Sequence, residues 1–522
     1  MQDEGRAAIL GLVPPDSRSS RRWVLAASIL GSGMAFIDSN VVTVSLPVVQ
    51  KQLGATVSTV QWVVESYALF LSSLVLVGGV LADRFGRKKI FLLGVAVFAA
   101  ASLACGLAPG AVALVAARGV QGIGAALLVP SSLALLGAAF PPKDRGKAVG
   151  TWSALTSLSA AVGPALGGWL VQAISWRAVF LINLPIAAAL LWITIRHVPE
   201  SRNPQAGRLD LAGAAFATFG LGALVYGLIE APTAGWAAPR TWGSVAAGLV
   251  ALAAFVVVEL RARHPMVPMA FFRNRTFAAA NLLTLFLYAA LAAWFFFFPF
   301  VLIQARGYSP AASGAALLPL VVFMSGGSRA AGALADRVGP RLPLTAGPLL
   351  AAAGFALFAV LPPDGSYSVS ILPALLVLGI GITVAVAPLT ATILNCVDED
   401  DQGMASGVNN AVARVAGLLA IAMFGIAAAS AFQRELDRRL DAAHVSPETR
   451  RFLEPQRAKL GAMEPPAGAS EKEKRAIESS IGAALDSAFR RVSGICAALA
   501  VAAAACGAAT TAKKRPRSAA RG

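Results

Sequence analysis

Three ionisable residues lie inside long apolar stretches of this sequence, where a charge is costly and therefore informative. Asp38 lies in the run FIDSNVVTVSLP, Glu65 in WVVESY and Arg118 in RGVQGIGAA. A charged side chain at the centre of a membrane-spanning helix costs roughly 2.5–3.5 kcal/mol on insertion scales. We therefore expect these side chains to face protein or water and to have a function.

The positions of the three residues predict a common depth in the membrane. Asp38 precedes Pro47 by nine residues, which places it roughly 13 Å below the outer end of its helix. Glu65 and Arg118 each lie about seven residues into a helix that enters from outside, hence roughly 10 Å down. Desolvation and a like-charged neighbour favour a proton on one acid, whereas Arg118 favours its loss, which is the physics of a proton switch. Alternatively, Asp38 and Arg118 form a structural pair that fixes helix packing, with Glu65 tilted toward an aqueous mouth.

The elements that must position these residues are transmembrane helices. The chain has 522 residues, 57% of them hydrophobic and 14% charged, and a spanning helix needs about 20 mostly apolar residues. The sequence predicts an all-α membrane protein with about fourteen such helices. The predicted spans are 24–47, 58–81, 90–108, 111–136, 148–172, 177–196, 211–229, 243–260, 278–303, 310–332, 344–361, 370–395, 406–430 and 492–511. The first span is too long for a signal sequence and lacks a following cleavage site, so it is expected in the mature protein.

A repeated basic loop divides the spans into two related halves. The order G-x-L-A-D-R-x-G-x-basic occurs once after the second span and again before the eleventh. Its glycines permit a sharp turn, and its basic residues mark a cytoplasmic loop. The two copies are eight spans apart rather than six, so a two-helix insertion is expected between two six-helix bundles. The residues assigned to this conformational loop are Gly79, Asp83, Arg84, Gly86 and Arg87, with Asp336 and Arg337 in the second copy.

The distribution of charge predicts orientation and cellular location. The formal net charge is +17, and the basic residues gather in alternate loops, as the positive-inside rule requires of a multi-pass protein with both termini in the cytoplasm. This placement indicates a cell (inner) membrane protein rather than a nucleic-acid-binding one. The basic tail is an orientation signal that could also contact anionic lipid.

The predicted domains follow from these spans. They are a cytoplasmic segment 1–22, a six-helix bundle 23–200, a two-helix insertion with linkers 201–265, a second bundle 266–511 and a basic cytoplasmic tail 512–522. The second bundle includes a polar extracytoplasmic loop 430–490, in which 434–441 and 471–486 are candidate short amphipathic helices.

The fifth span carries a pattern of small residues that predicts close helix packing. Gly163 and Gly167 stand four residues apart and form a smooth face, and Pro164 between them removes a backbone donor and bends the helix. With Gly150 at the start of the motif, they predict a tight, kinked interface that two rocking halves would need.

Aromatic and amide side chains near the charged residues, and the aromatic run WFFFFPF of the ninth span, are candidates for a substrate cavity. An aromatic belt at the outer interface explains the aromatic run equally well. The candidate residues are Phe36, Trp62, Tyr67, Gln121, Trp294 and Phe298.

These motifs resemble those of the major facilitator superfamily, in its fourteen-helix branch of drug/proton antiporters. The loop order G-x-L-A-D-R-x-G-R-K is the best known signature of that superfamily. The orders D-x-x-V-V-x-V-x-L-P around Asp38 and R-x-x-Q-G-x-G-A-A from Arg118 look like the family's, where these residues are tied to proton coupling. The fifth span resembles the exporter motif G-x8-G-x3-G-P-x2-G-G, except that Ser159 replaces the middle glycine. Many family members have an uncharged residue where this chain has Glu65.

The residues and the resemblance together predict a proton-coupled secondary exporter of amphipathic organic compounds or drugs. It would alternate access to a midplane cavity between two bundles and use a proton gradient, with no cofactor and no enzymatic activity. Scattered cysteines, few histidines and no G-x-x-x-x-G-K-[ST] motif predict no metal site and no ATP hydrolysis. Export of one metabolite or self-made antibiotic is an alternative, as is a non-transporting receptor or intramembrane enzyme. The sequence leaves any partner channel open.

Overall fold

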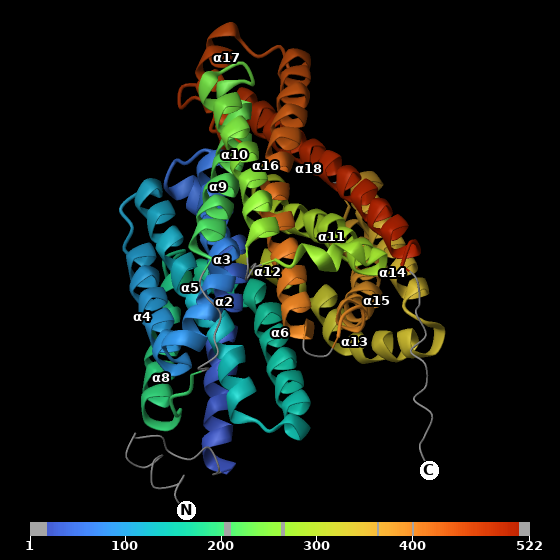
Figure 1. Ribbon diagram of the computed structural model, residues 1–522. Helices are drawn as coiled ribbons and strands as arrows, with labels where there is room; N and C mark the ends of the chain where they lie inside the picture. Colours follow the sequence, from blue (N-terminus) through green and yellow to red (C-terminus); the bar gives the residue numbers. More distant parts are fainter. Residues whose placement is uncertain (1–17, 203–209, 263–266, 363–364, 399–400, 511–522) are drawn as a thin grey trace, which may run out of the picture. The chain divides into compact units, whose positions relative to one another are not determined.

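Every regular element in the described part of the chain is a helix (Figure 1). The computed structural model describes residues 18–202, 210–262, 267–362, 365–398 and 401–510. In order, the helices are α2 (Arg18–Gln52), α3 (Val57–Phe85), α4 (Arg87–Gly106), α5 (Ala111–Ala139), α6 (Pro142–Ala173), α7 (Ala178–Leu181), α8 (Asn183–His197), α9 (Leu211–Ala234), α10 (Pro239–Arg261), η1 (Met269–Arg273), α11 (Arg275–Phe300), η2 (Val301–Ala305), α12 (Pro310–Ala315), α13 (Leu318–Val338), α14 (Arg341–Val360), η3 (Tyr367–Ile371), α15 (Leu372–Asn395), α16 (Gln402–Ala442), α17 (Pro447–Leu453), η5 (Glu454–Ala462) and α18 (Glu471–Ala508).

Twelve helices within the described residues are long and apolar enough to cross a membrane. The predicted all-α, multi-pass class of fold is therefore confirmed, whereas the predicted number of fourteen spans is not. The two predicted spans outside the twelve, 148–172 and 310–332, are helical as well. The first lies in α6, and the second is divided between α12 and α13.

The helices form two compact units. Unit 1 comprises Met1–Met266, Ala292–Leu318 and Leu418–Val492. Unit 2 comprises Val267–Leu291, Pro319–Gly417 and Ser493–Gly522. These units differ from the predicted division into two bundles and an insertion, which stays a prediction.

Unit 1 contains the helices that carry the three intramembrane charges. Helix α5 packs against α3 and α4, and α2 packs against α6, α5 and α8 (Figure 1). Buried aromatic and aliphatic side chains fill the space between them, among them Met34, Phe91, Phe98 and Leu128. Because lipid tails are as apolar as these side chains, such helices associate through close packing and interhelical polar contacts rather than through the hydrophobic effect. Helices α9 and α10, the predicted insertion, pair with each other, and α9 also packs against α3.

The small residues of α6 lie where other helices approach most closely. A Cβ at Gly163 would stand 2.6 Å from Cβ of Asn40, and one at Gly167 would stand 2.7 Å from the carbonyl oxygen of Val41, both on α2. Around Gly150 there is open space, so close approach does not account for that glycine. Pro164 lies close to α12: a Cβ added at Gly314 would clash with the carbonyl oxygen of Pro164. The role of this interface in rocking stays a prediction.

The first copy of the repeated loop forms a tight turn between α3 and α4. Gly86 has φ of 115°, a backbone conformation that residues with a side chain rarely adopt. Arg87 and Asp83 form an ion pair of 2.7 Å across the turn, while Arg84 is exposed and Gly79 makes only ordinary contacts. The carboxylate of Glu200 accepts hydrogen bonds from the backbone N–H groups of residues 88 and 89 at the start of α4.

The second copy of the loop ends α13 in unit 2. Gly339 has φ of 82° and separates α13 from α14, and Arg337 is exposed. The side chain of Asp336 lies outside the described residues.

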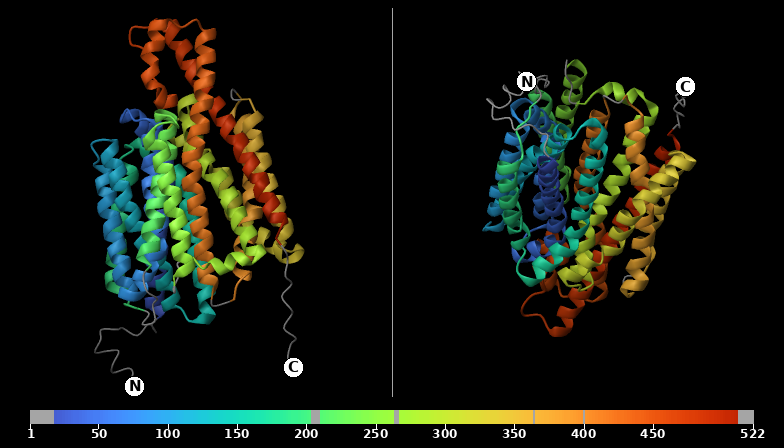
Figure 2. Two further views of the ribbon diagram at one scale, coloured as in Figure 1. Left: turned by 45° about the horizontal axis from the view of Figure 1, so that its top comes forward. Right: turned by 90° about the horizontal axis from the view of Figure 1, so that it is seen from below.

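The polar segment 430–490 extends the long helices α16 and α18. The stretches 434–441 and 471–486 are not separate short helices: they are the last turns of α16 and the first turns of α18. Figure 2 shows α17 and η5, coloured orange, between these extended ends. Arg457 of η5 binds Asp437 of α16 at 2.6 Å, and Arg306 binds Asp486 of α18 at 3.2 Å.

Candidate functional site

A fully buried ion pair joins α2 to α5. The guanidinium of Arg118 donates from Nη1 to Oδ2 of Asp38 at 2.6 Å, and these side chains are 1% and 0% exposed. Its Nε donates to the carbonyl oxygen of Val63 on α3 at 3.0 Å. The same guanidinium lies over the ring of Tyr67, 4.2 Å from the centroid, where the ring face attracts a cation. Arg118 is thus held by two neighbouring helices.

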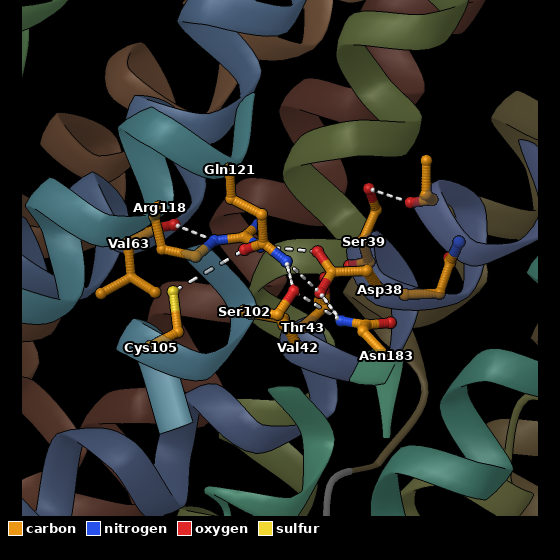
Figure 3. Close-up of polar contacts among 12 residues, drawn as sticks. Asp38, Ser39, Val42, Thr43, Val63, Ser102, Cys105, Arg118, Gln121 and Asn183 are labelled. Atoms are coloured by element: carbon orange, nitrogen blue, oxygen red, sulfur yellow. Dashed lines mark hydrogen bonds and ion pairs between the residues drawn. The ribbon is translucent and has the colours of Figure 1, made fainter. Parts of the chain in front are cut away.

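Uncharged polar side chains complete the surroundings of Asp38 (Figure 3). Gln121 and Asn183 each donate a side-chain N–H to Oδ1 of Asp38 at 2.8 Å. Gln121 also donates to the hydroxyl of Ser102 at 2.8 Å and accepts from Arg118 at 2.7 Å. The thiol of Cys105 lies 3.7 Å from the same Gln121 oxygen. Helices α2, α4, α5 and α8 all contribute to this cluster, which we call the Asp38 network (Asp38, Ser102, Cys105, Arg118, Gln121 and Asn183).

The Asp38 network matches an ionised carboxylate. An ionised aspartate only accepts hydrogen bonds, and here three separate side chains donate to it. A buried charge is tolerated when it is paired and its remaining lone pairs are satisfied. The predicted meeting of Asp38 and Arg118 is therefore present in the structure. Whether the pair exchanges a proton or only holds the helices together stays to be tested.

Glu65 is buried apart from this network. Its side chain on α3 is 0% exposed, and neither carboxyl oxygen has a hydrogen-bond partner in the described structure. Gln61, one turn earlier on the same face of α3, donates to the carbonyl oxygen of Ile421 on α16. The interpretation that places Glu65 at an aqueous mouth does not fit this burial.

The predicted cavity residues fall into three different environments. Tyr67 and Gln121 belong to the surroundings of Arg118, as described above. Trp294 and Phe298 stack on each other with centroids 4.4 Å apart and are 0% and 1% exposed, which argues against an exposed aromatic belt for these two. Phe36 and Trp62 are half-buried, and Trp62 lies 6.3 Å from the ring of Tyr226 on α9. Their assignment to a substrate cavity stays a prediction.

One cavity in unit 1 lies away from these residues. It measures about 280 Å³ and is lined by the first turns of α3, the end of α9, part of α16 and η5. Gln61, Thr233, Gln433 and Arg457 are among its polar side chains. None of the six predicted cavity residues lines it.

Sequence reasoning missed Ser102, Cys105 and Asn183 as site residues. A serine or a cysteine in a spanning helix bonds to its own helix so often that neither stands out. Asn183 carried a stronger signal, because it is an amide within a predicted span and stands two residues before a proline. An amide buried in an apolar span needs partners in the same way as a charge does.

Comparison with known proteins agrees with this architecture. The sequence profile of the Major Facilitator Superfamily matches residues 28–421, more than half of the chain. The chain is 35% identical over 430 residues to the multidrug resistance protein Stp of Mycobacterium tuberculosis, covering 82% of this chain and 80% of that protein. It is 36% identical over 419 residues to the tetracenomycin C resistance and export protein of Streptomyces glaucescens, covering 80% and 78%.

The fold is also that of solved transporters. A bacterial homologue of the human lysosomal transporter Spinster, in an inward-facing and unoccupied conformation, superposes with a TM-score of 0.62 at 19% identity, over 94% of this chain and 98% of that one. The protein belongs to the Major Facilitator Superfamily, and its relatives are multidrug and antibiotic resistance and export proteins.

Proposed function

We propose that this protein is a proton-coupled antiporter that exports amphipathic organic compounds across the cell (inner) membrane, with both termini in the cytoplasm. Membership of the superfamily and the names of the relatives, multidrug resistance and tetracenomycin C resistance and export, support export of small organic molecules. The proton gradient is the proposed driving force, and no cofactor is required.

The observation that carries the coupling is the buried Asp38–Arg118 pair. Ionisable residues within spanning helices are expensive and typically mark ion or substrate pathways and proton relays. The two side chains lie 2.6 Å apart and are 1% exposed or less, so the pair is buried in the described conformation. A change of conformation that admits water or separates the two side chains would change the proton affinity of Asp38, which is what coupling requires.

The two acids are proposed to have different protonation states in this conformation. Asp38 is ionised, since Arg118, Gln121 and Asn183 all donate to it. Glu65 holds a proton, since a buried carboxylate without a hydrogen-bond partner would leave an uncompensated charge. Proton binding would then stabilise the protonated form of an acid, and substrate binding would stabilise its ionised form. Alternation between these two forms would couple proton entry to substrate export.

The test is efflux from proteoliposomes that contain the purified protein and carry a proton gradient. A protonophore should abolish efflux of a fluorescent amphipathic cation, and Asp38→Asn should lower the initial rate by about a hundredfold, the scale of a lost proton-transfer group. Ser131→Ala is the matched control: Ser131 is a buried polar residue of α5 that bonds only within its own helix. It should retain efflux. Efflux that survives both the protonophore and Asp38→Asn at a normal protein level contradicts the proposal.

A narrower function is favoured by one relative. The Streptomyces glaucescens protein is named for a single compound, tetracenomycin C, so this chain could likewise serve one metabolite or self-made antibiotic. A susceptibility panel in cells with and without the protein separates the two functions. Protection against many unrelated amphipathic compounds supports a multidrug exporter, and protection against one chemical class supports the narrower function.

A further inference from the structure

Asn183 has one side-chain atom that the network around Asp38 leaves unsatisfied. Its Nδ2 donates to Oδ1 of Asp38 at 2.8 Å and to the hydroxyl of Ser102 at 3.3 Å. Its Oδ1 is buried and has no hydrogen-bond partner in the described structure, and the residue is 0% exposed. A buried carbonyl without a donor is costly and needs an explanation.

The explanation follows from what Asp38 would need once it takes up a proton. A protonated carboxyl group has one O–H that must find an acceptor. Arg118 offers only donors, and the oxygen of Gln121 already accepts from Arg118 and faces the thiol of Cys105. The oxygen of Asn183 is the acceptor in this network that is not yet engaged.

We propose that Asn183 is a positioning residue that turns its amide with the protonation state of Asp38. Its Nδ2 faces the ionised carboxylate, as in this structure, and its Oδ1 accepts the O–H of the protonated acid. A half-turn of the amide exchanges its oxygen and nitrogen without changing its shape, so even a closely packed helix contact permits it. This inference rests on the proposed function, since it requires that Asp38 exchange a proton.

Ser102 is suited to follow that turn. In the described state its hydroxyl oxygen accepts from both Gln121 and Asn183. After the turn it keeps the bond from Gln121 and donates its own hydrogen to Oδ1 of Asn183, because a hydroxyl both donates and accepts. In both states the carboxyl group of Asp38 and the hydroxyl of Ser102 are paired, and the end of the Asn183 amide that points away from them is the one without a partner.

The other titratable groups near Asp38 do not supply an acceptor for the O–H of the protonated acid. Arg118 of α5 is the ion-pair partner, and Cys105 of α4 points at Gln121. On α3, Tyr67 lies beneath the guanidinium and Glu65 makes no hydrogen bond to the network. The residue that accepts the O–H of Asp38 therefore lies on α8, whereas Arg118 lies on α5 and Glu65 on α3.

Infrared difference spectroscopy of the reconstituted protein between low and high pH tests the proposal. The carbonyl band of protonated Asp38 is identified by its loss in Asp38→Asn. In Asn183→Leu this band should move to higher frequency, because the O–H loses its acceptor, and the efflux rate should fall on the order of tenfold. Asn183→Ser, whose hydroxyl can both donate and accept, should restore part of the rate and part of the band position. Asn409→Leu, the same change in unit 2, should alter neither.

The outcomes separate the two proposals. If Asp38→Asn removes no pH-dependent acid band, Asp38 does not titrate and the proposed coupling itself fails. If the band is present but unmoved in Asn183→Leu, with only thermal stability reduced, Asn183 has a merely structural role and this inference is overturned. Should Asn183→Leu not reach the membrane, the band position in Asn183→Ser decides, and a position identical to that of the unmodified protein contradicts the proposal.

Discussion

Each of the two units contains a polar cluster within its spanning helices, and the two clusters differ in charge. The Asp38 network of unit 1 contains an ion pair and four further residues around it. In unit 2, Asn409 of α16 donates to Oδ1 of Asn281 at 3.2 Å and to the hydroxyl of Thr284 at 2.7 Å, both on α11. Asn281 and Thr284 are 3% and 0% exposed. Both clusters satisfy polar atoms inside an apolar interior, but only the first contains groups that can gain or lose a proton.

The difference in charge gives the two clusters of buried polar side chains different roles. The neutral cluster has one protonation state, so its hydrogen bonds can do no more than join α11 to α16. The charged network has at least two states whose hydrogen-bond needs differ, and it includes an amide oxygen that the present state leaves unused. Coupling should therefore be sensitive to substitutions in unit 1 and tolerant of those in unit 2.

The largest effect in this comparison is expected from Arg118→Leu. The change leaves Asp38 without its ion-pair partner. The carbonyl oxygen of Val63 and the side-chain oxygen of Gln121 also lose the hydrogen bonds that Arg118 donates to them. Breaking a buried pair on one side typically destabilises by about 3–5 kcal/mol, so the melting temperature in detergent should fall and efflux should be lost.

Arg118→Lys sharpens this prediction. Lysine keeps the charge, but it lacks the planar fork that reaches Asp38, Gln121 and Val63 together. It should retain most of the stability and only part of the transport. If Arg118→Leu transports as well as the unmodified protein, the ion pair has no place in coupling.

Glu65→Gln tests whether unit 1 contains a second proton site. Glutamine has the shape of the protonated acid, so a Glu65 that holds a proton in this conformation should be replaced with little loss of folded protein. If the proton leaves Glu65 during transport, the number of protons exchanged per substrate should fall by one. The measurement is the reversal point of substrate flux in proteoliposomes at set pH and substrate gradients. An unchanged stoichiometry would confine coupling to Asp38.

The sequence predicted the meeting of Asp38 and Arg118 because a helix rises by a fixed amount per residue. Counting residues from the outer ends of two oppositely directed helices gave similar depths, and the structure joins the two side chains at 2.6 Å. Depth alone does not say which way a side chain points around its helix. Glu65 therefore shares the predicted depth yet lies outside the network.

The remaining partners could not be predicted because they carry no charge. Gln121 was assigned to the substrate cavity, whereas the structure places it between Asp38, Arg118 and Ser102. Asn183 could be given no role from the sequence, since one amide in an apolar run does not reveal its neighbour on another helix. Helix packing supplies that information, and the order of residues along one chain does not.

The extended ends of α16 and α18 show a similar limit. Polar composition correctly indicated helical propensity over 434–441 and 471–486, but it also suggested a break from the spans. No proline or glycine interrupts the chain between residues 426 and 442, so the spanning helix continues into the polar segment. The absence of a helix-breaking residue was the better guide here.

The smallest effect is expected from Asn409→Leu in the neutral cluster. Interhelical hydrogen bonds within membrane helices contribute about 0.6 kcal/mol on average and at most about 1.7 kcal/mol, and two such bonds are lost. The melting temperature in detergent should fall slightly, with no change in the pH dependence or proton stoichiometry of efflux. The matched comparison is Asn183→Leu, the same substitution at an amide that touches Asp38. A loss of coupling in Asn409→Leu equal to that in Asn183→Leu would show that unit 2 takes part in proton transfer, and charge would then no longer distinguish the two clusters.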